Sequence, residues 1–254
     1  MSYILKKKLA NKKNYGGTRK LSAIKYIVIH YTGNNGDHDE SNANYFKEHI
    51  VKASAHYFVD SDSVTQSVPD GSIAWSVGGS KYSNCKTTGG GKLYGKCTNS
   101  NSISVELCDD VKDGKVYPSA QTIANALELT RKLMKKYNVP ASNVIRHFDV
   151  NGKSCPAYWC GTAEKNKKWK TAFHDKLTAE DSDQKGNGEF LVKVLVNELT
   201  IRVGAGANTK AVGSIKDKGT YTITEIEYNE TTPWGKLKSG NGYISLLDKY
   251  CKRV

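Results

Sequence analysis

His147 and Cys155 lie eight positions apart in the stretch "RHFDVNGKSCP". Imidazole and thiolate are ligands that zinc accepts, and a catalytic zinc site uses three protein ligands with a fourth position left for water. The third ligand has to come from elsewhere in the chain. His30 is the strongest candidate because it ends the apolar run "YIVIH", where a side chain emerges at the edge of a sheet. Taken singly, each of the three residues favours a plain structural role, whereas their combination favours a metal site.

Strands and helices alternate over the first part of the chain. "AIKYIVIHYT" is a β-branched apolar run typical of a strand buried on both faces, and "ASAHYFVD" and "SISVELC" indicate two more strands. Apolar residues spaced by three and four positions predict a helix from Gln121 to Tyr137, with Ser119 as its N-cap. Its expected buried face holds Ile123, Ala126, Leu127, Thr130, Met134 and Tyr137. "EKNKKWKTAFHDKL" predicts a second helix, so this part is expected to be an α/β domain.

A boundary is indicated at residues 178–189, "TAEDSDQKGNGE", which contains no large apolar residue and suits an exposed linker. We therefore predict a first domain over residues 1–178, a linker over 179–188 and a second domain over 189–254. The second domain reads as several short strands separated by turns rich in Gly, Asn and Lys. Such a pattern predicts a small all-β barrel.

The net charge of +13 is concentrated in the first part of the chain. Basic residues outnumber acidic ones by 27 to 15 over residues 1–178, and by only 10 to 7 over 187–254. The first part is therefore expected to meet an anionic partner, such as nucleic acid or a cell wall rich in carboxylates and phosphates. No recognition helix or aromatic binding motif accompanies the charge, so we expect no nucleic-acid partner.

The sequence contains no run of 18 apolar residues, so no membrane-spanning helix is expected. The basic start "MSYILKKKLANKKN" lacks the apolar core of a secretory signal peptide. The six cysteines are therefore expected to be reduced thiols made in a cytoplasm. A Cys85–Cys97 disulfide formed later in oxidising surroundings stays open.

The order of four segments, "IVIHYTG", "SAHYFVD", "NSISVEL" and "RHFDVNGKSCP", resembles that of the zinc-dependent N-acetylmuramoyl-L-alanine amidases. These enzymes share their fold with the peptidoglycan recognition proteins. The resemblance covers roughly residues 20–177. It implies zinc held by His30, His147 and Cys155 in a surface groove of a mixed central sheet flanked by helices. It also implies bacterial peptidoglycan as the partner.

The same resemblance implies tasks for three further residues. Lys153 stands where many members carry a lysine, and would stabilise the oxygen that becomes anionic when water attacks an amide carbonyl. Glu106 matches a glutamate of members from phages of Gram-positive hosts, and is expected to shuttle the proton. His56 stands where other members carry a tyrosine base, and is expected to contact the substrate or a residue beside the metal. Asp149 either orients an imidazole or initiates a turn; both interpretations stay open.

The last part of the chain resembles bacterial Src-homology-3-like domains. The matching stretches are "LTIRVGAGANTKAVGSIKDKGTYTI" and "WGKLKSGNGYISLLDKY". The resemblance implies a module that holds bacterial peptidoglycan through its peptide or cross-bridge. The aromatic residues that would either contact the wall or fill the core of the barrel are Tyr221, Tyr228, Trp234 and Tyr243.

Together these features predict a phage endolysin that cuts the amide between N-acetylmuramic acid and L-alanine. We expect a monomer that stays in the host cytoplasm until lysis, inserts into no membrane, and then acts on the cell wall. A host autolysin with the same activity and a non-catalytic peptidoglycan-binding protein are the alternatives. A cysteine peptidase using Cys155 and His147 is less favoured, because Cys155 precedes a proline on a loop and not at a helix N-terminus that would lower its pKa.

Overall fold

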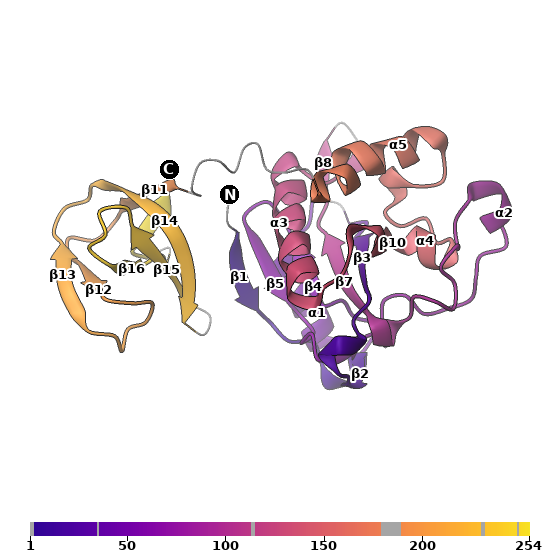
Figure 1. The fold of residues 1–254 in the computed structure, drawn as a ribbon, viewed down its shortest axis with the longest axis horizontal. Helices are drawn as coiled ribbons and strands as arrows, with labels where there is room; N and C mark the ends of the chain where they lie inside the picture. The colour runs from indigo at the N-terminus through magenta and orange to yellow at the C-terminus, as the bar shows by residue number, and fades with distance from the viewer. Residues whose placement is uncertain (1–2, 35, 113–114, 179–188, 230–231, 248) are drawn as a thin grey trace. The chain divides into compact units, whose positions relative to one another are not determined.

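The computed structural model describes residues 3–34, 36–112, 115–178, 189–229, 232–247 and 249–254. Contacts divide the chain into two compact units (Figure 1). The first comprises residues 5–179, and the second comprises residues 180–254 together with 1–4. The predicted linker, residues 179–188, lies outside the described residues. None of the described helices has the length and apolar character needed to span a membrane.

A six-stranded mixed sheet forms the centre of the first unit (Figure 1). Its strands are, in spatial order, β1 (Ile4–Lys7), β5 (Ser63–Gln66), β4 (Tyr57–Val59), β7 (Ser102–Leu107), β3 (Tyr26–Tyr31) and β10 (Val144–Arg146). Strands β10, β3, β7 and β4 run parallel, and β5 pairs antiparallel with β4. Ile27, Val28 and Ile29 of β3 have no exposed surface, which agrees with the predicted strand buried on both faces.

Five α-helices and several shorter elements complete the described part of the first unit. The helices are α1 (Asp39–Glu48), α2 (Cys85–Thr88), α3 (Ala120–Tyr137), α4 (His147–Asn151) and α5 (Ala163–Ala172). The 3-10 turns are η1 (Lys12–Asn14), η2 (Leu21–Ala23), η3 (Asn99–Asn101), η4 (Ala141–Asn143), η5 (Ala157–Trp159) and η6 (His174–Leu177). Two small hairpin sheets pair β2 (Tyr15–Thr18) with β6 (Ser72–Ala74), and β8 (Asp110–Lys112) with β9 (Lys115–Tyr117).

Helix α3 confirms the predicted helix and its cap, and half of the predicted buried face, namely Ala126, Leu127 and Thr130. The Ser119 hydroxyl accepts a hydrogen bond from the backbone N–H of Thr122 at 3.0 Å, as expected of an N-cap. The buried residues are Thr122, Asn125, Ala126, Leu127, Leu129, Thr130 and Leu133, whereas Ile123 and Met134 are only partly covered. The buried face also includes Asn125, whose amide donates to the backbone carbonyl of Asp60 at 2.9 Å. A polar contact of this kind cannot be read from apolar spacing.

The second predicted helix is shorter than expected. Helix α5 ends at Ala172, and the chain continues as the 3-10 turn η6. Phe173 between them is fully buried and stacks on Trp169, with ring centroids 5.3 Å apart. Burial of this ring turns the chain and ends the helix.

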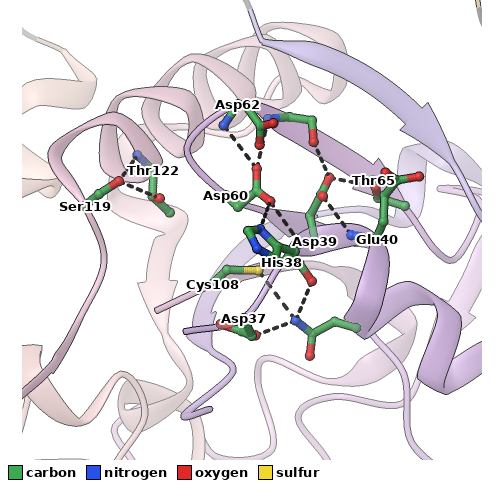
Figure 2. A network of polar contacts seen from close by, with 12 residues as sticks. Asp37, His38, Asp39, Glu40, Asp60, Asp62, Thr65, Cys108, Ser119 and Thr122 are labelled. Atoms are coloured by element: carbon green, nitrogen blue, oxygen red, sulfur yellow. Dashed lines mark hydrogen bonds and ion pairs between the residues drawn. The ribbon is translucent and has the colours of Figure 1, made fainter. Parts of the chain in front are cut away.

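The N-terminus of α1 is tied to the β4–β5 hairpin by carboxylates (Figure 2). Asp39 accepts hydrogen bonds from the hydroxyls of Ser63 at 3.0 Å and Thr65 at 2.6 Å. Asp60 accepts from the backbone N–H of Asp39 at 3.2 Å and of Ser63 at 2.9 Å. Carboxylates at a helix N-terminus satisfy its free N–H groups and favour its dipole. The network therefore fixes α1 against the sheet.

The second unit is a seven-stranded antiparallel sheet. Its spatial order is β13 (Ala211–Ile215), β12 (Leu199–Arg202), β16 (Tyr243–Ser245), β15 (Thr232–Leu237), β14 (Thr220–Asn229), β11 (Phe190–Val194) and β17 (Cys251–Arg253). Alternate residues of β11 and β12 are buried, and their side chains join an apolar core that includes Ile223 and Ile244. Among the four candidate aromatic residues, Trp234 and Tyr243 are buried and Tyr221 is half-buried. The side chain of Tyr228 lies outside the described part.

Asp70 joins α3 to the sheet in the first unit. Its carboxylate accepts hydrogen bonds from Tyr57 of β4 at 2.7 Å, from Gln66 of β5 at 3.2 Å, and from Lys136 of α3 at 3.1 Å, and it also contacts the Tyr137 hydroxyl. Burial alone would raise the pKa of Asp70. The hydrogen bonds from Tyr137, Tyr57 and Lys136 outweigh burial and hold this pKa below its ordinary value.

We predict that Asp70→Asn lowers the free energy of unfolding by about 1–3 kcal/mol at pH 7, because buried donors lose a charged acceptor. A carboxyl with a lowered folded-state pKa stabilises the fold above its unfolded pKa, and this stability is lost as the pH falls below about 4. Urea unfolding at pH 7 and pH 3 measures both effects, with Asp175→Asn as an exposed control. An equal deficit for Asp70→Asn at the two pH values contradicts the ionic role.

Candidate functional site

Three neighbouring parallel strands end at one edge of the sheet and carry the first site residues there. In the register of β3 with β7, His30 lies directly opposite Glu106. Strand β10 pairs with β3 through Arg146 and Ile29, so His147 follows immediately at the same edge. The carboxyl edge of a parallel sheet is where side chains from separate strands can gather. Strands β10, β3 and β7 are neighbours in the sheet (Figure 1). Their order therefore brings His30, Glu106 and His147 together.

A short closed loop returns Cys155 to His147. Helix α4 begins at His147 and ends at Gly152, which has a φ of 92°. The backbone N–H of Phe148 donates to the carbonyl of Cys155 at 3.0 Å, which closes the loop. Arg146 and Asp149 fix the start of the helix, because the Asp149 carboxylate accepts from both the backbone and the guanidinium of Arg146. The Asp149 carboxylate thus holds the first turn of the helix, and its described contacts are with Arg146, not with an imidazole.

His30, His147 and Cys155 form a possible metal site. One ligand atom from each lies within 4.8 Å of the others. Among the described His, Cys, Asp and Glu side chains, these three form the group that lies close enough together to hold one metal ion. The Cys155 sulfur lies 3.7 Å from His30 Nδ1. All three side chains are buried. His30 Nε2 and both ring nitrogens of His147 have no hydrogen-bond partner among the described residues.

Burial sets the protonation of this group. Burial, with the charges of His147 and Lys153 adding to it, holds the pKa of His30 well below its ordinary value. Burial and then Lys153 lower the pKa of His147 to about 4. Both imidazoles are therefore neutral at pH 7 and offer lone pairs. Buried nitrogens without partners cost free energy unless something binds them, and two imidazoles with one thiol are a donor set that suits a tetrahedral metal.

Glu106 lies beside this group. Its Oε1 atom is 3.8 Å from His30 Nδ1, and its side chain is 18% exposed. Burial raises the pKa of Glu106 to about 8, while the charge of Lys153 opposes that shift. A carboxyl whose pKa lies near neutrality can both accept and return a proton.

Two cavities meet at the site. One of about 770 Å³ includes His147, and one of about 670 Å³ includes His30, Glu106 and Cys155. Lys153 lines both cavities, together with Trp75 and Ser76. The predicted metal ligands and the predicted catalytic residues thus lie on the walls of one continuous concave surface.

His56 is placed differently from the other predicted residues. It is 1% exposed and lines neither cavity. Its Nδ1 lies 3.1 Å from the backbone nitrogen and from the hydroxyl of Ser104, and its Nε2 lies 2.9 Å from the Arg19 guanidinium and 3.2 Å from the Ser72 carbonyl. Burial, followed by the Arg19 charge, lowers its pKa to about 3. The expected substrate contact stays a prediction, and the occupied ring nitrogens favour a structural role.

The remaining observations concern a surface histidine, two cysteines and the residues that line the cavities. His38 is exposed and pairs with Asp60, and Cys85 and Cys97 are both free thiols. Sequence reasoning did not single out most of the lining residues, among them Lys52, Trp75, Ser76 and Lys81. No spacing pattern in the Gly-rich and Lys-rich loop marks which of its lysines face the cavity.

Comparisons with known proteins point to one class. The family model described as N-acetylmuramoyl-L-alanine amidase matches residues 20–158. N-acetylmuramoyl-L-alanine amidase CwlL of Bacillus licheniformis is 33% identical over 145 residues, which are 55% of this chain and 38% of that protein. The chain spans the same 38% of a second curated relative, a probable N-acetylmuramoyl-L-alanine amidase of the same organism.

Solved structures give the same picture. The structure of PlyL is 28% identical with a TM-score of 0.53, and the match covers 69% of this chain and 97% of that one. A mutant endolysin from Bacillus subtilis is 26% identical with a TM-score of 0.50, covering 67% of this chain and 96% of that one. The mixed α/β fold of the first unit is therefore similar to that of these proteins.

Proposed function

The chain belongs to the N-acetylmuramoyl-L-alanine amidase family, and we propose that it hydrolyses the amide between N-acetylmuramic acid and L-alanine in bacterial peptidoglycan. The observation that carries the proposal is the buried group of His30, His147 and Cys155, in which three of the four imidazole nitrogens have no hydrogen-bond partner among the described residues. This group opens onto a concave surface that also holds a proton-transfer candidate and a cation.

We infer that the metal is zinc, held by His30, His147 and Cys155. When bound there, zinc supplies Lewis acidity that polarises an amide carbonyl and acidifies water. Neutral imidazoles are ready to bind a cation without losing protons. The Cys155 thiol, whose pKa burial raises well above its ordinary value, has to release its proton as the metal enters.

Glu106 and Lys153 supply the remaining chemistry. Glu106 takes the proton from the attacking water and returns it to the departing amine of L-alanine, which a carboxyl with a raised pKa can do. Lys153 lines both cavities and keeps a positive charge where the carbonyl oxygen becomes anionic, which stabilises the transition state.

Two other classes of function fit the site less well. A cysteine peptidase needs an accessible thiolate, whereas Cys155 is 2% exposed and burial raises its pKa. A protein that only binds peptidoglycan has no need for a buried thiol beside two unpaired imidazoles. Hydrolysis is therefore the function that the site supports best.

We further propose that the chain is a phage endolysin acting as a monomer, with a second unit that attaches it to the wall. Similarity to a Bacillus subtilis endolysin structure supports the first part. The short antiparallel strands and the "GYISL" close of the second unit support a Src-homology-3-like wall-binding domain. Release from the host cytoplasm at lysis would bring both units to peptidoglycan, and a host autolysin is the alternative source.

Mass spectrometry of digested peptidoglycan tests the bond that is cut. Hydrolysis at the proposed amide should produce stem peptides with a new N-terminal L-alanine, while the glycan strands stay intact. Chelation of the metal before digestion should abolish the release of these peptides. New reducing sugar ends, or peptides cut within the stem, contradict the proposed bond.

Glu106→Gln should keep the fold and the bound zinc but lower the rate by about 10²–10⁴, because the amide side chain cannot transfer the proton. Turnover of a soluble muramyl peptide and metal analysis of the same sample provide the two measurements. Glu164→Gln, a change at an exposed position of α5, is the matched control and should leave the rate unchanged. A Glu106→Gln rate near that of the unchanged protein assigns the proton transfer to another group.

A fragment of residues 189–254 fused to a fluorescent protein should label the walls of susceptible cells. Its small charge surplus predicts labelling that persists in about 0.3 M salt, where surface charge is strongly screened. The fragment of residues 1–178 should cut soluble muramyl peptides but act more slowly on whole cells, because tethering raises the local concentration of the enzyme. Loss of labelling at that salt concentration, with the fluorescent protein alone as control, contradicts the attachment role.

A further inference from the structure

The two cavities that meet at the site differ in charge. The cavity of about 770 Å³ is lined by Lys52, Lys81 and Lys153, and no aspartate or glutamate is among its lining residues. The cavity of about 670 Å³ has Lys153 together with Asp37 and Glu106. We call the first cavity the basic arm. The charge of the basic arm therefore distinguishes one end of the groove from the other.

Lys52 is held at the basic arm by a buried amide. It has a φ of 56°, in the left-handed region that residues other than glycine rarely adopt. Asn14, which has no exposed surface, accepts hydrogen bonds from the backbone N–H of Val51 at 2.8 Å and of Lys52 at 3.1 Å. The Asn14 amide also donates to the carbonyl of His49 at 2.7 Å. A strained backbone fixed by a buried side chain is a feature that clusters at functional positions.

Lys81 is held at the same cavity by contacts between the long loop and α4. The backbone N–H of Tyr82 donates to the carbonyl of Asn151 at 2.8 Å, and that of Gly91 donates to the carbonyl of Phe148 at 2.9 Å. The Lys81 side chain packs over Gly91, where an added Cβ would come within 2.7 Å of its Cε. The loop is thus attached to the helix that begins with the metal-ligand candidate His147.

None of the three ammonium groups forms a close ion pair with a described carboxylate. Within the described part of the chain, no carboxylate oxygen lies within 4.0 Å of the Nζ atoms of Lys52, Lys81 or Lys153. Like charges that converge from three separate segments repel one another, and a concave surface of one sign attracts an oppositely charged ligand. An anionic group of the substrate is therefore the natural occupant of the basic arm.

We propose that the basic arm binds a carboxylate on the peptide side of the scissile amide, and that Lys52 and Lys81 determine specificity for substrates that carry it. This inference rests on the proposed amidase function. The stem peptide carries free carboxylates beyond L-alanine, whereas the adjoining amino sugars are uncharged. The other cavity is lined by the carboxyl groups of Asp37 and Glu106 and by one lysine in place of three, so it attracts a carboxylate less and is left for the uncharged side of the substrate.

A matched pair of substrates tests the proposal. One is an N-acetylmuramoyl tetrapeptide with free carboxylates, and the other is the same compound with its carboxylates converted to carboxamides. The unchanged protein should cut the acid with a kcat/KM about a hundredfold higher than the amide, as expected for two charge-assisted contacts of about tenfold each. Lys52→Met and Lys81→Met should each lower kcat/KM for the acid about tenfold, mainly by raising KM. They should leave kcat/KM for the amide unchanged.

Lys86→Met is the matched control, because Lys86 is an exposed lysine of the same loop that does not line the cavity. Equal losses for both substrates, or acid turnover unchanged in Lys52→Met and Lys81→Met, overturn the proposal. If the unchanged protein cuts neither substrate, the amidase function fails instead. Calorimetric binding of the free tetrapeptide then decides alone: weaker binding by the Lys52→Met, Lys81→Met double variant supports the basic arm, and equal binding overturns it.

Discussion

The structure of the first unit depends on keeping two imidazoles and a thiol together out of water. Uncompensated polar atoms in a protein interior cost free energy, and His30 and His147 present three such nitrogens among the described residues. The surroundings supply no acceptor for them but place three ligand atoms within reach of one centre. The arrangement is costly as a set of side chains and favourable as a set of ligands.

Each supporting element can be understood from that constraint. Parallel pairing of β3 with β7 and β10 delivers His30, Glu106 and His147 to one edge of the sheet. The buried Arg146 fixes the first turn of α4 through Asp149, and donates to the carbonyl of Trp159 at 2.5 Å on the far side of the Cys155 loop. The long loop then packs on α4 so closely that a Cβ at Gly152 would overlap the sulfur of Cys85. The groove wall and the ligands are therefore parts of one rigid arrangement.

Local signals in the sequence were sufficient for the strands, the Ser119 cap and the spacing of His147 and Cys155. The end of an apolar strand also suggested His30, whereas resemblance to a family was needed for the roles of Lys153 and Glu106, because residues distant in sequence meet only through strand order. The prediction of the buried face of α3 was only partly correct. It did not include Asn125, which is buried and bonded to a carbonyl from another segment. The burial of His56 and the convergence of Lys52 and Lys81 depend on contacts made by Ser104, Asn14 and α4, which no periodicity encodes.

The identity of the zinc ligands is the central claim, and X-ray absorption at the zinc edge of the purified chain measures it directly. Zinc held by His30, His147 and Cys155 should show two nitrogen neighbours at about 2.0–2.1 Å, one sulfur at about 2.3 Å and one further light atom. Replacement of Cys155 by serine should remove the sulfur signal. Zinc surrounded by light atoms alone in the unchanged protein, or a chain that binds no zinc, would contradict the proposed centre.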